Sequence, residues 1–192
     1  MSSKLETVEN ADMSQKTPKS ISIHKIKKNT IILKANFGGG GRGSRIVHKN
    51  EDFSEVLSLV KQEAKSFSGS NLVFAEEVIE DSRHIEVQIL GDGQSCIHLF
   101  ERDCSFQRNF QKFIEFAPAP NLTFQTKEKL YKYAVTLCKS VGYKGLGTVE
   151  FLIDKNEKIY FMEVNPRVQV EHTITEELTG IDLIRSQINV FC

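Results

Sequence analysis

Residues 148–165 read TVEFLIDKNEKIYFMEVN, two short apolar runs on either side of a charged turn. This pattern predicts a β-hairpin, because apolar runs bounded by Asp, Asn and Lys are typical of paired strands. Each run contains one glutamate, Glu150 or Glu163. With the turn centred between Asn156 and Glu157, the two carboxylates lie directly opposite each other on one face of the sheet. The same register pairs apolar residues of the two runs: Ile153 with Tyr160 and Phe151 with Met162.

Two carboxylates in opposite positions indicate a possible cation site. Like charges there destabilise a sheet by roughly 0.2 to 1 kcal/mol, and by more when they are buried. A divalent cation between Glu150 and Glu163 reverses the sign of this interaction, and Asn165 adds a neutral oxygen on the same face. Hard cations such as Mg²⁺ accept this set of ligands. The alternative is a solvent-facing sheet whose glutamates are incidental.

The segment NPRVQVEH continues the pattern, because its polar residues follow Asn165 at steps of two. In an extended chain one polar face therefore runs from Glu163 to Glu171 and includes Arg167 and Gln169. An arginine between carboxylates can hold an oxyanion through two hydrogen bonds, and a nearby glutamate can act as a general base. The alternative is a solvated edge strand, which Pro166 favours locally.

Composition and charge limit the classes of protein to consider. The 192 residues are 40 % hydrophobic, enough for a packed core, and carry 25 basic and 25 acidic side chains. The net charge of zero argues against general attraction to nucleic acid or to an anionic membrane. Four cysteines without metal-ligand spacing predict free thiols rather than disulfides. No apolar segment is long enough to span a bilayer, and the first residues lack a signal-peptide pattern, so we expect a cytoplasmic protein.

The remaining segments predict a mixture of helices and strands. Residues 1–28 contain few large apolar residues and predict a disordered tail. Strands are expected at 30–34 and 45–47, and a small meander is expected from 72–79, 84–90 and 96–101. The predicted helices share apolar residues at helical spacing: one after an N-cap at Asn50, one from Thr126 to a stop at Gly142, and one after a capping box at 173–176. The fold class is α+β.

The glycine-rich segment GGGGRG at 38–43 lies between two predicted strands. Walker A and Rossmann loops run from a strand to a helix, so neither pattern fits. Consecutive glycines leave backbone N–H groups free to close on phosphates, with Arg42 at the tip and Lys34 beside them. The alternative is a merely flexible loop.

Several segments together resemble the biotin carboxylase domain of biotin-dependent carboxylases, and most closely its pyruvate carboxylase branch. They are LKANFGGGGRGSRIV, RHIEVQIL, HLFERDCSFQRNFQK, APAP, GTVEF and EVNPRVQVEHTITEELTGIDLI. The resemblance implies an ATP-grasp domain over 29–192, with a lid subdomain over about 29–84 and part of the catalytic subdomain over about 85–192. It also implies ATP-dependent carboxylation of biotin by bicarbonate, with Mg²⁺ or Mn²⁺ as the metal and biotin carried on a partner domain.

The resemblance implies a role for individual residues. The ATP-binding residues are Lys34, Gly38, Gly39, Gly40, Gly41, Glu76, Ile79, His84, Gln107, Glu150 and Glu163. The metal ligands are Glu150, Glu163 and Asn165. The bicarbonate contacts are Lys112, Arg167, Gln169 and Val170. The catalytic residues are Arg167, Lys112 and Glu171, of which Glu171 is the base.

The sequence also departs from the family. Phe110 stands where the family has an ATP-side histidine, Ser44 where it has methionine, and Glu77 where it has lysine. The family's domain before Ile31 and its part after Cys192 have no counterpart in this sequence, and no biotin-carrier motif is found.

Two functions therefore stay open. One is a carboxylase subunit that acts only when another chain complements it. The other is a non-catalytic module that binds MgATP or a carboxylase partner. We expect the isolated chain to be inactive and to self-associate or be marginally stable, because an apolar face near its end loses its cover. That face consists of Ile181, Leu183, Ile184, Ile188, Val190 and Phe191.

Overall fold

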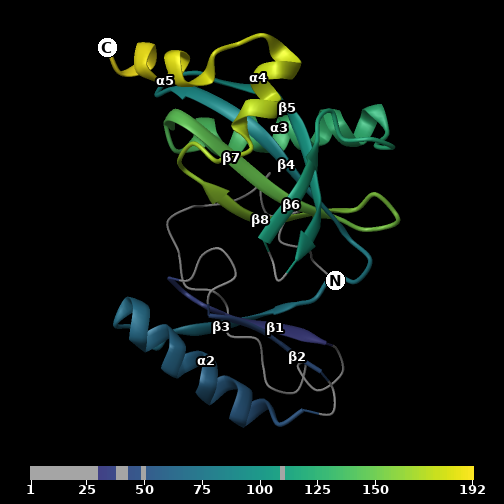
Figure 1. Cartoon of the computed structure of the whole chain (residues 1–192), viewed down its shortest axis with the longest axis vertical. Coiled ribbons are helices and arrows are strands. Elements are labelled where there is room, and N and C mark those ends of the chain that lie inside the picture. Colours follow the sequence, from purple (N-terminus) through teal and green to yellow (C-terminus); the bar gives the residue numbers. More distant parts are fainter. Residues whose placement is uncertain (1–29, 38–42, 49–50, 109–110) are drawn as a thin grey trace. The chain divides into compact units, whose positions relative to one another are not determined.

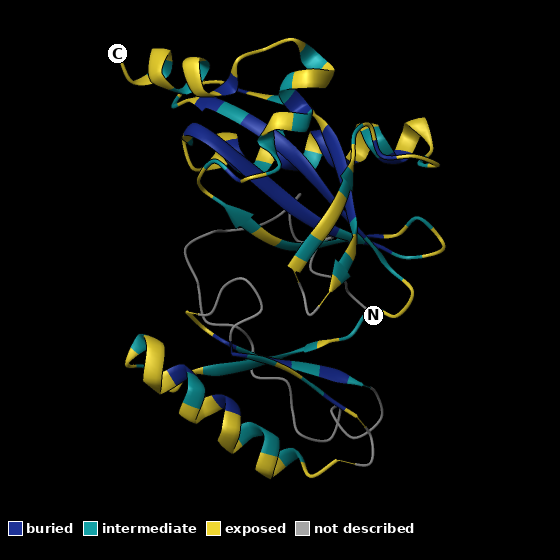
Figure 2. Ribbon diagram, in the orientation of Figure 1, coloured by how far each residue is buried: buried dark blue, intermediate teal, exposed yellow. Residues whose placement is uncertain are grey.

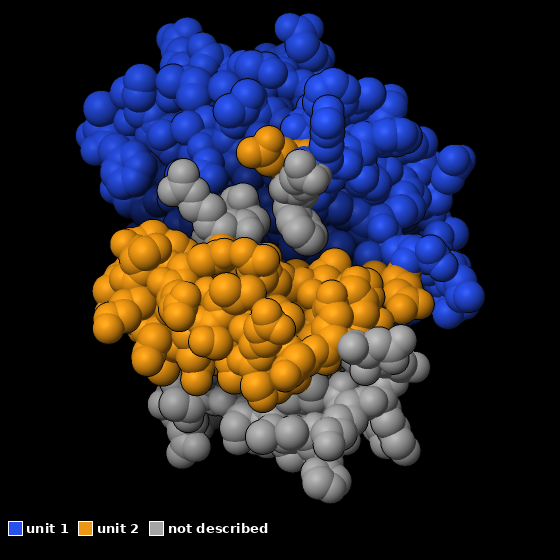
Figure 3. Space-filling model, turned by 60° about the horizontal axis from the view of Figure 1, so that its bottom comes forward, with its two compact units in different colours: residues 1–11, 81–108, 112–192 blue, residues 12–80, 109–111 orange. Residues whose placement is uncertain are grey.

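The computed structural model describes residues 30–37, 43–48, 51–108 and 111–192. The predicted tail at 1–28, the glycines 38–41, Asn50 and Phe110 lie outside the described residues. The described chain divides into two compact units, which Figure 3 shows in different colours. One unit holds residues 81–108 and 112–192, and the other holds the described residues from 30 to 80 together with Gln111.

The smaller unit is a three-stranded antiparallel sheet packed against one helix. Its strands lie in the order β2-β1-β3, with β1 at Ile31–Ala35, β2 at Ser44–Val47 and β3 at Val73–Glu77. Helix α2, Phe53–Ser68, presents buried residues to the sheet and exposed residues to the opposite side (Figure 2). Its N-cap is Asp52, whose side chain accepts a hydrogen bond from Ser54 N at 2.8 Å, and not the predicted Asn50.

The larger unit is built on a five-stranded sheet in the order β6-β5-β4-β7-β8 (Figure 1). Its strands are β4 at Arg83–Asp92, β5 at Cys96–Arg108, β6 at Gln111–Phe116, β7 at Lys144–Ile153 and β8 at Ile159–Asn165. Its helices are α3 at Phe124–Ser140, α4 at His172–Thr179 and α5 at Leu183–Phe191. The α+β prediction is confirmed. Among the described residues, no helix is long and apolar enough to cross a membrane.

The two faces of this sheet differ in chemistry. Ile85, Val87 and Ile89 alternate along β4 and pack with α3 in the main hydrophobic core. The residues between them, His84, Glu86 and Gln88, are polar and also buried. Strand β4 therefore has no solvent face, and its polar side chains need partners within the protein.

The hairpin register is the predicted one at the glutamates and differs nearer the turn. Glu150 pairs with Glu163, as predicted. The predicted pairs of Ile153 with Tyr160 and Phe151 with Met162 are wrong. Instead, Ile153 pairs with Ile159 and Phe151 with Phe161. A β-bulge beside Glu150 absorbs the extra residue and restores the expected register beyond it.

Several predicted boundaries are also wrong. Strand β3 pairs with β1 in the smaller sheet, so it does not continue the meander of β4 and β5. Helix α3 is capped by the Thr123 side chain and begins before Thr126. The 173–176 segment is not a capping box, because α4 already begins at His172 and has no side-chain cap.

Two further predictions near the end of the chain need correction. The polar segment beyond Glu163 does not stay extended, since β8 ends at Asn165, next to Pro166, which lacks an N–H for the ladder. The apolar face near the end keeps partial cover. Leu183 is fully buried against Leu99 and Leu146, whereas Ile184 and Ile188 are exposed.

Candidate functional site

The polar face of the larger sheet carries a row of charged residues across four neighbouring strands. Arg102 of β5 pairs with Glu86 of β4, Glu86 with Glu150 of β7, and Glu150 with Glu163 of β8. Paired residues project from the same face, so three glutamates and one arginine lie side by side. Glu86 and Glu150 are buried, whereas Glu163 is exposed.

Lys112 joins three carboxylates of this site. Its ammonium group donates to Glu150 Oε1 at 2.9 Å and to Glu171 Oε1 at 2.6 Å. A third short hydrogen bond goes to Glu86 Oε2. An ammonium group has three N–H donors, so all three are used. Lys112 comes from β6 and Glu171 directly precedes α4, so only the folded chain brings them together.

Arg102 is completely buried and forms hydrogen bonds with Glu86 and its neighbours. Its Nε donates to Glu86 Oε1 at 2.6 Å. Its Nη1 donates to Gln88 Oε1 at 2.8 Å and to Thr175 Oγ1 of α4 at 2.6 Å. Glu86 therefore lies between two cations, Arg102 behind it and Lys112 in front.

Glu150 is the most heavily contacted carboxylate. Its Oε1 accepts from Asn165 Nδ2 at 2.9 Å and from Gln169 Nε2 at 3.2 Å, in addition to Lys112. Its Oε2 lies 3.0 Å from His84 Nε2, within ion-pair distance but outside hydrogen-bond geometry. His84 Nδ1 lies 2.6 Å from Gln107 Nε2.

These contacts shift the pKa values of the charged groups. Burial alone would raise the pKa of Glu150, but His84 and Lys112 outweigh it and lower that pKa to about 2. Burial would raise the pKa of Glu171, but the hydrogen bonds from Lys112 and from a backbone N–H, with the charges of Lys112 and Arg102, together lower that pKa. Burial would lower the pKa of Lys112, but the neighbouring Glu86 and Glu150 raise it. All three groups are therefore charged at neutral pH.

The site offers the oxygen atoms that a divalent cation requires. Glu150 and Glu163 offer carboxylate oxygens from opposite positions. The Oε1 atom of Gln169 is buried and has no hydrogen-bond partner in the described part of the chain. A buried amide oxygen is costly to leave unsatisfied. This oxygen is therefore suited to contact a polar ligand. Mg²⁺ is compatible with this oxygen-rich set.

The structure brings many of the predicted residues together and leaves others apart. The residues that converge on the polar face are His84, Gln107, Lys112, Glu150, Asn165, Gln169 and Glu171. Arg167 is exposed and donates to Val168 O at 3.2 Å, and Val170 is 91 % exposed. In the smaller unit, Lys34 and Glu76 form an ion pair of 2.7 Å, and Ile79 is half-buried.

Sequence reasoning missed Glu86 and Arg102. The signal for Glu86 was present, because His84, Glu86 and Gln88 follow one another at steps of two through an otherwise apolar strand. Nothing comparable marks Arg102, since the segment ERDC around it reads as an ordinary charged strand end.

Comparison with known protein families gives one match over nearly the whole chain. The family described as "Carbamoyl-phosphate synthase L chain, ATP binding domain" matches residues 2–191.

Curated relatives are pyruvate carboxylases. The mitochondrial pyruvate carboxylase of Rattus norvegicus is 53 % identical over 161 residues, which is 83 % of this chain and 14 % of that protein. The Bacillus subtilis (strain 168) pyruvate carboxylase is 52 % identical over 161 residues, again 83 % of this chain and 14 % of that protein. The chain thus spans only 14 % of the length of these relatives.

Similar solved structures include two carboxylases and one carboxylase domain. A biotin carboxylase from Campylobacter jejuni has a TM-score of 0.82 at 45 % identity and covers 84 % of this chain and 36 % of its own. The biotin carboxylase domain of Hydrogenobacter thermophilus 2-oxoglutarate carboxylase, a complex with MgADP and bicarbonate, has a TM-score of 0.82 at 41 % identity, over 88 % of this chain and 37 % of its own. A Rhizobium etli pyruvate carboxylase has a TM-score of 0.81 at 46 % identity. This match covers 84 % of the present chain and 14 % of the Rhizobium etli chain.

Proposed function

The chain belongs to the carbamoyl-phosphate synthase L chain ATP-binding family, as part of a biotin carboxylase domain with the ATP-grasp fold, and we propose that it binds ATP with a divalent metal for bicarbonate-dependent carboxylation of biotin. The convergence of Lys112, Glu171 and Glu150 on one polar face is the observation that carries this proposal. Lys112 is a cation that could bind an oxyanion, Glu171 is a candidate base, and Glu150 is a candidate metal ligand. Turnover would require a complementing chain and a carrier that presents biotin.

The proposal gives each group a task. Lys112 and Gln169 would bind bicarbonate, with Arg167 and the backbone of Val170 completing its contacts. Glu171 would accept the proton of bicarbonate, since its lowered pKa keeps it ionised and able to act as a base. His84 and Gln107 would contact the nucleotide.

The remaining assignments concern the nucleotide and the metal. Lys34, Glu76, Ile79 and the glycines 38–41 would bind ATP from the smaller unit. Glu150, Glu163 and Asn165 would hold Mg²⁺ or Mn²⁺. The metal would neutralise charge on the phosphate oxygens that take part in transfer.

Thermal unfolding with and without MgATP tests nucleotide and metal binding. By mass action, ligand at one hundred times its dissociation constant stabilises the fold by roughly 2.7 kcal/mol. We expect MgATP to raise the melting temperature, Glu163→Gln to lose most of this shift, and Glu177→Gln, an exposed glutamate of α4, to keep it. A full shift in Glu163→Gln would show that the carboxylate pair is not the metal site.

ATP hydrolysis separates the catalytic function from the non-catalytic alternative. If the chain turns over alone or with a complementing chain, hydrolysis should rise with bicarbonate and fall at least tenfold in Arg167→Ala and Glu171→Ala. Arg185→Ala, at an exposed position of α5, serves as the control. MgATP binding without bicarbonate-dependent hydrolysis would favour the binding module. Phe110→His is the matching gain-of-function variant.

We also propose that the exposed face of α5 associates with a second surface, on a complementing chain or another copy. The exposed apolar residues at helical spacing on and before α5 support this proposal: Ile181, Ile184, Ile188 and Phe191.

A further inference from the structure

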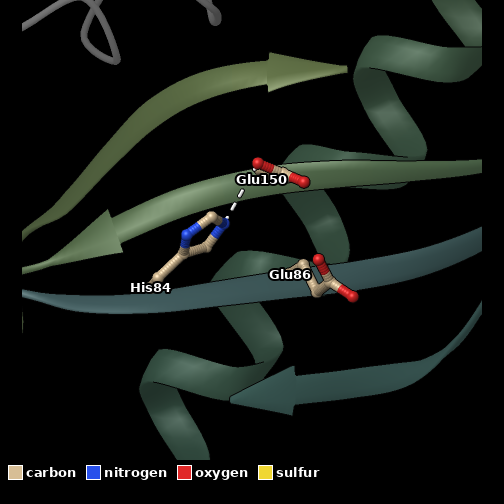
Figure 4. A group of neighbouring side chains, drawn as sticks. All are labelled: His84, Glu86 and Glu150. Atoms are coloured by element: carbon tan, nitrogen blue, oxygen red, sulfur yellow. Dashed lines mark ion pairs between the residues drawn. The ribbon is translucent and has the colours of Figure 1, made fainter. Parts of the chain in front are cut away.

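The buried carboxylates of the site are satisfied by a cation of the protein itself. Glu86 and Glu150 lie opposite each other on β4 and β7, and Figure 4 shows them on the same side of the sheet with His84. Oxygens of the two glutamates and a nitrogen of His84 lie within 4.8 Å of one another. Lys112 donates to both carboxylates and to Glu171.

The Oε1 atom of Glu150 has little capacity left for another cation in this state. Its Oε1 already accepts hydrogen bonds from Lys112, Asn165 and Gln169, although a carboxylate oxygen has only two lone pairs. Any metal that binds this oxygen must displace a donor. The ammonium group of Lys112 is the donor that the metal repels, because both are positively charged.

The same ammonium group also blocks the other chemistry of the site. Lys112 donates all three of its N–H groups to residues of the protein. One of these hydrogen bonds is accepted by an oxygen of Glu171. In this arrangement Lys112 has no N–H group left for an oxyanion, and Glu171 Oε1 is occupied by Lys112. Arg102 stays bound to Glu86 from behind, so this carboxylate keeps one cation when Lys112 leaves.

We propose that Lys112 is a tethered counter-ion that competes with the divalent metal for Glu150, so that metal binding releases both Lys112 and Glu171 for the oxyanion. This inference rests on the proposed metal function and adds an autoinhibitory contact to it. By linkage, metal and oxyanion then bind with positive coupling, because the metal removes the internal ion pairs that the oxyanion must otherwise break.

Mn²⁺ alone is the probe, and free Mn²⁺ is measured by electron paramagnetic resonance in titrations of the full chain. We expect Lys112→Met to bind Mn²⁺ at least tenfold more tightly than the original chain. Lys112→Arg keeps the charge and should stay within about threefold of the original. Adding Glu150→Gln to Lys112→Met should abolish the gain.

Lys127→Met is the matched control. Lys127 makes a similar partly buried ion pair, 2.7 Å from the buried Glu101, outside the Lys112 cluster. Its removal should leave the Mn²⁺ affinity unchanged. Thermal melts of each variant provide a second measurement, since Lys112→Met should gain a larger rise in melting temperature from Mn²⁺ than the original chain.

The outcomes separate this inference from the proposed function. Equal or weaker Mn²⁺ binding in Lys112→Met, with the original chain still binding, overturns the competition and leaves the metal function standing. A tenfold gain in Lys127→Met would also overturn it, because the effect would then be one of general charge. If neither the original chain nor any variant binds Mn²⁺, with or without ATP, the metal function fails together with this inference.

Discussion

At the scale of single residues, Arg102 shows how a buried charge is kept in this fold. It is fully buried and donates to Glu86, Gln88 and Thr175, so its guanidinium group is solvated by the protein instead of by water. Such a group contributes little net stability compared with an apolar residue, but removing one partner of a buried pair is costly. Arg102 holds the Glu86 carboxylate in place, and Glu86 in turn positions Lys112.

Arg102→Met should therefore lower the free energy of unfolding by about 3 to 5 kcal/mol, measured by urea denaturation, because Glu86 loses its rear cation. Arg45→Met is the control. Arg45 pairs with Glu63, and both side chains are more than 40 % exposed, so its loss should change stability by less than about 1 kcal/mol. Equal effects of the two substitutions would contradict the role given to Arg102.

At the scale of secondary-structure elements, the packing of the segment after α3 against the end of β4 depends on one glycine. Gly91 pairs with both Cys96 and Gly145 near the end of β4. A Cβ atom there would lie 2.2 Å from Tyr143 O, a backbone atom that cannot rotate away. The close approach of the segment after α3 to β4 therefore requires glycine.

Gly91→Ala should cost more stability than Gly69→Ala, although the φ of Gly91 lies outside the left-handed region. We expect a loss of about 3 kcal/mol or more, as for an overpacked core. Gly69 has a φ of +69° and nothing within 4 Å of an added Cβ, so alanine there should cost about 1 to 2 kcal/mol. Chemical denaturation compares the two, and a smaller loss at Gly91 would mean that the strand ends can move apart.

At the scale of the whole molecule, the exposed face of α5 is the feature most relevant to assembly. Leu183 faces inward, and Gln187 Oε1 accepts a hydrogen bond from Leu146 N at 3.0 Å, so one side of the helix is anchored to the sheet. The opposite side exposes Ile184 and Ile188. Contiguous apolar surface of this kind tends to be covered by another surface.

Sedimentation velocity at micromolar concentration should show self-association of the isolated chain. The double variant Ile184→Glu with Ile188→Glu should sediment as a monomer, because charged residues oppose burial of this face. Leu72→Glu, at an exposed position of the smaller unit, should leave association unchanged. A sharp monomer peak for the original chain would show that α5 needs no further cover.

The sequence by itself determined the features that depend on local periodicity. Alternation along 148–165 was enough to place Glu150 opposite Glu163, since side chains two residues apart share a face of a strand. It did not reveal the bulge between them and the turn, because a bulge changes the register without changing the apolar pattern. The helical spacing at 53–67 predicted α2, although its N-cap lay two residues later than expected.

Only the tertiary structure decided how the charges of the site are satisfied. Glu86, Arg102, Lys112 and Glu171 lie on or beside β4, β5, β6 and α4, and no sequence spacing relates them. Their partners follow from which strands are neighbours in the sheet and from the bend after β8 that turns Glu171 back toward Lys112. The physical reason is that desolvated charges are stable only beside opposite charges or hydrogen-bond partners, and the folded sheet brings these together from distant parts of the chain.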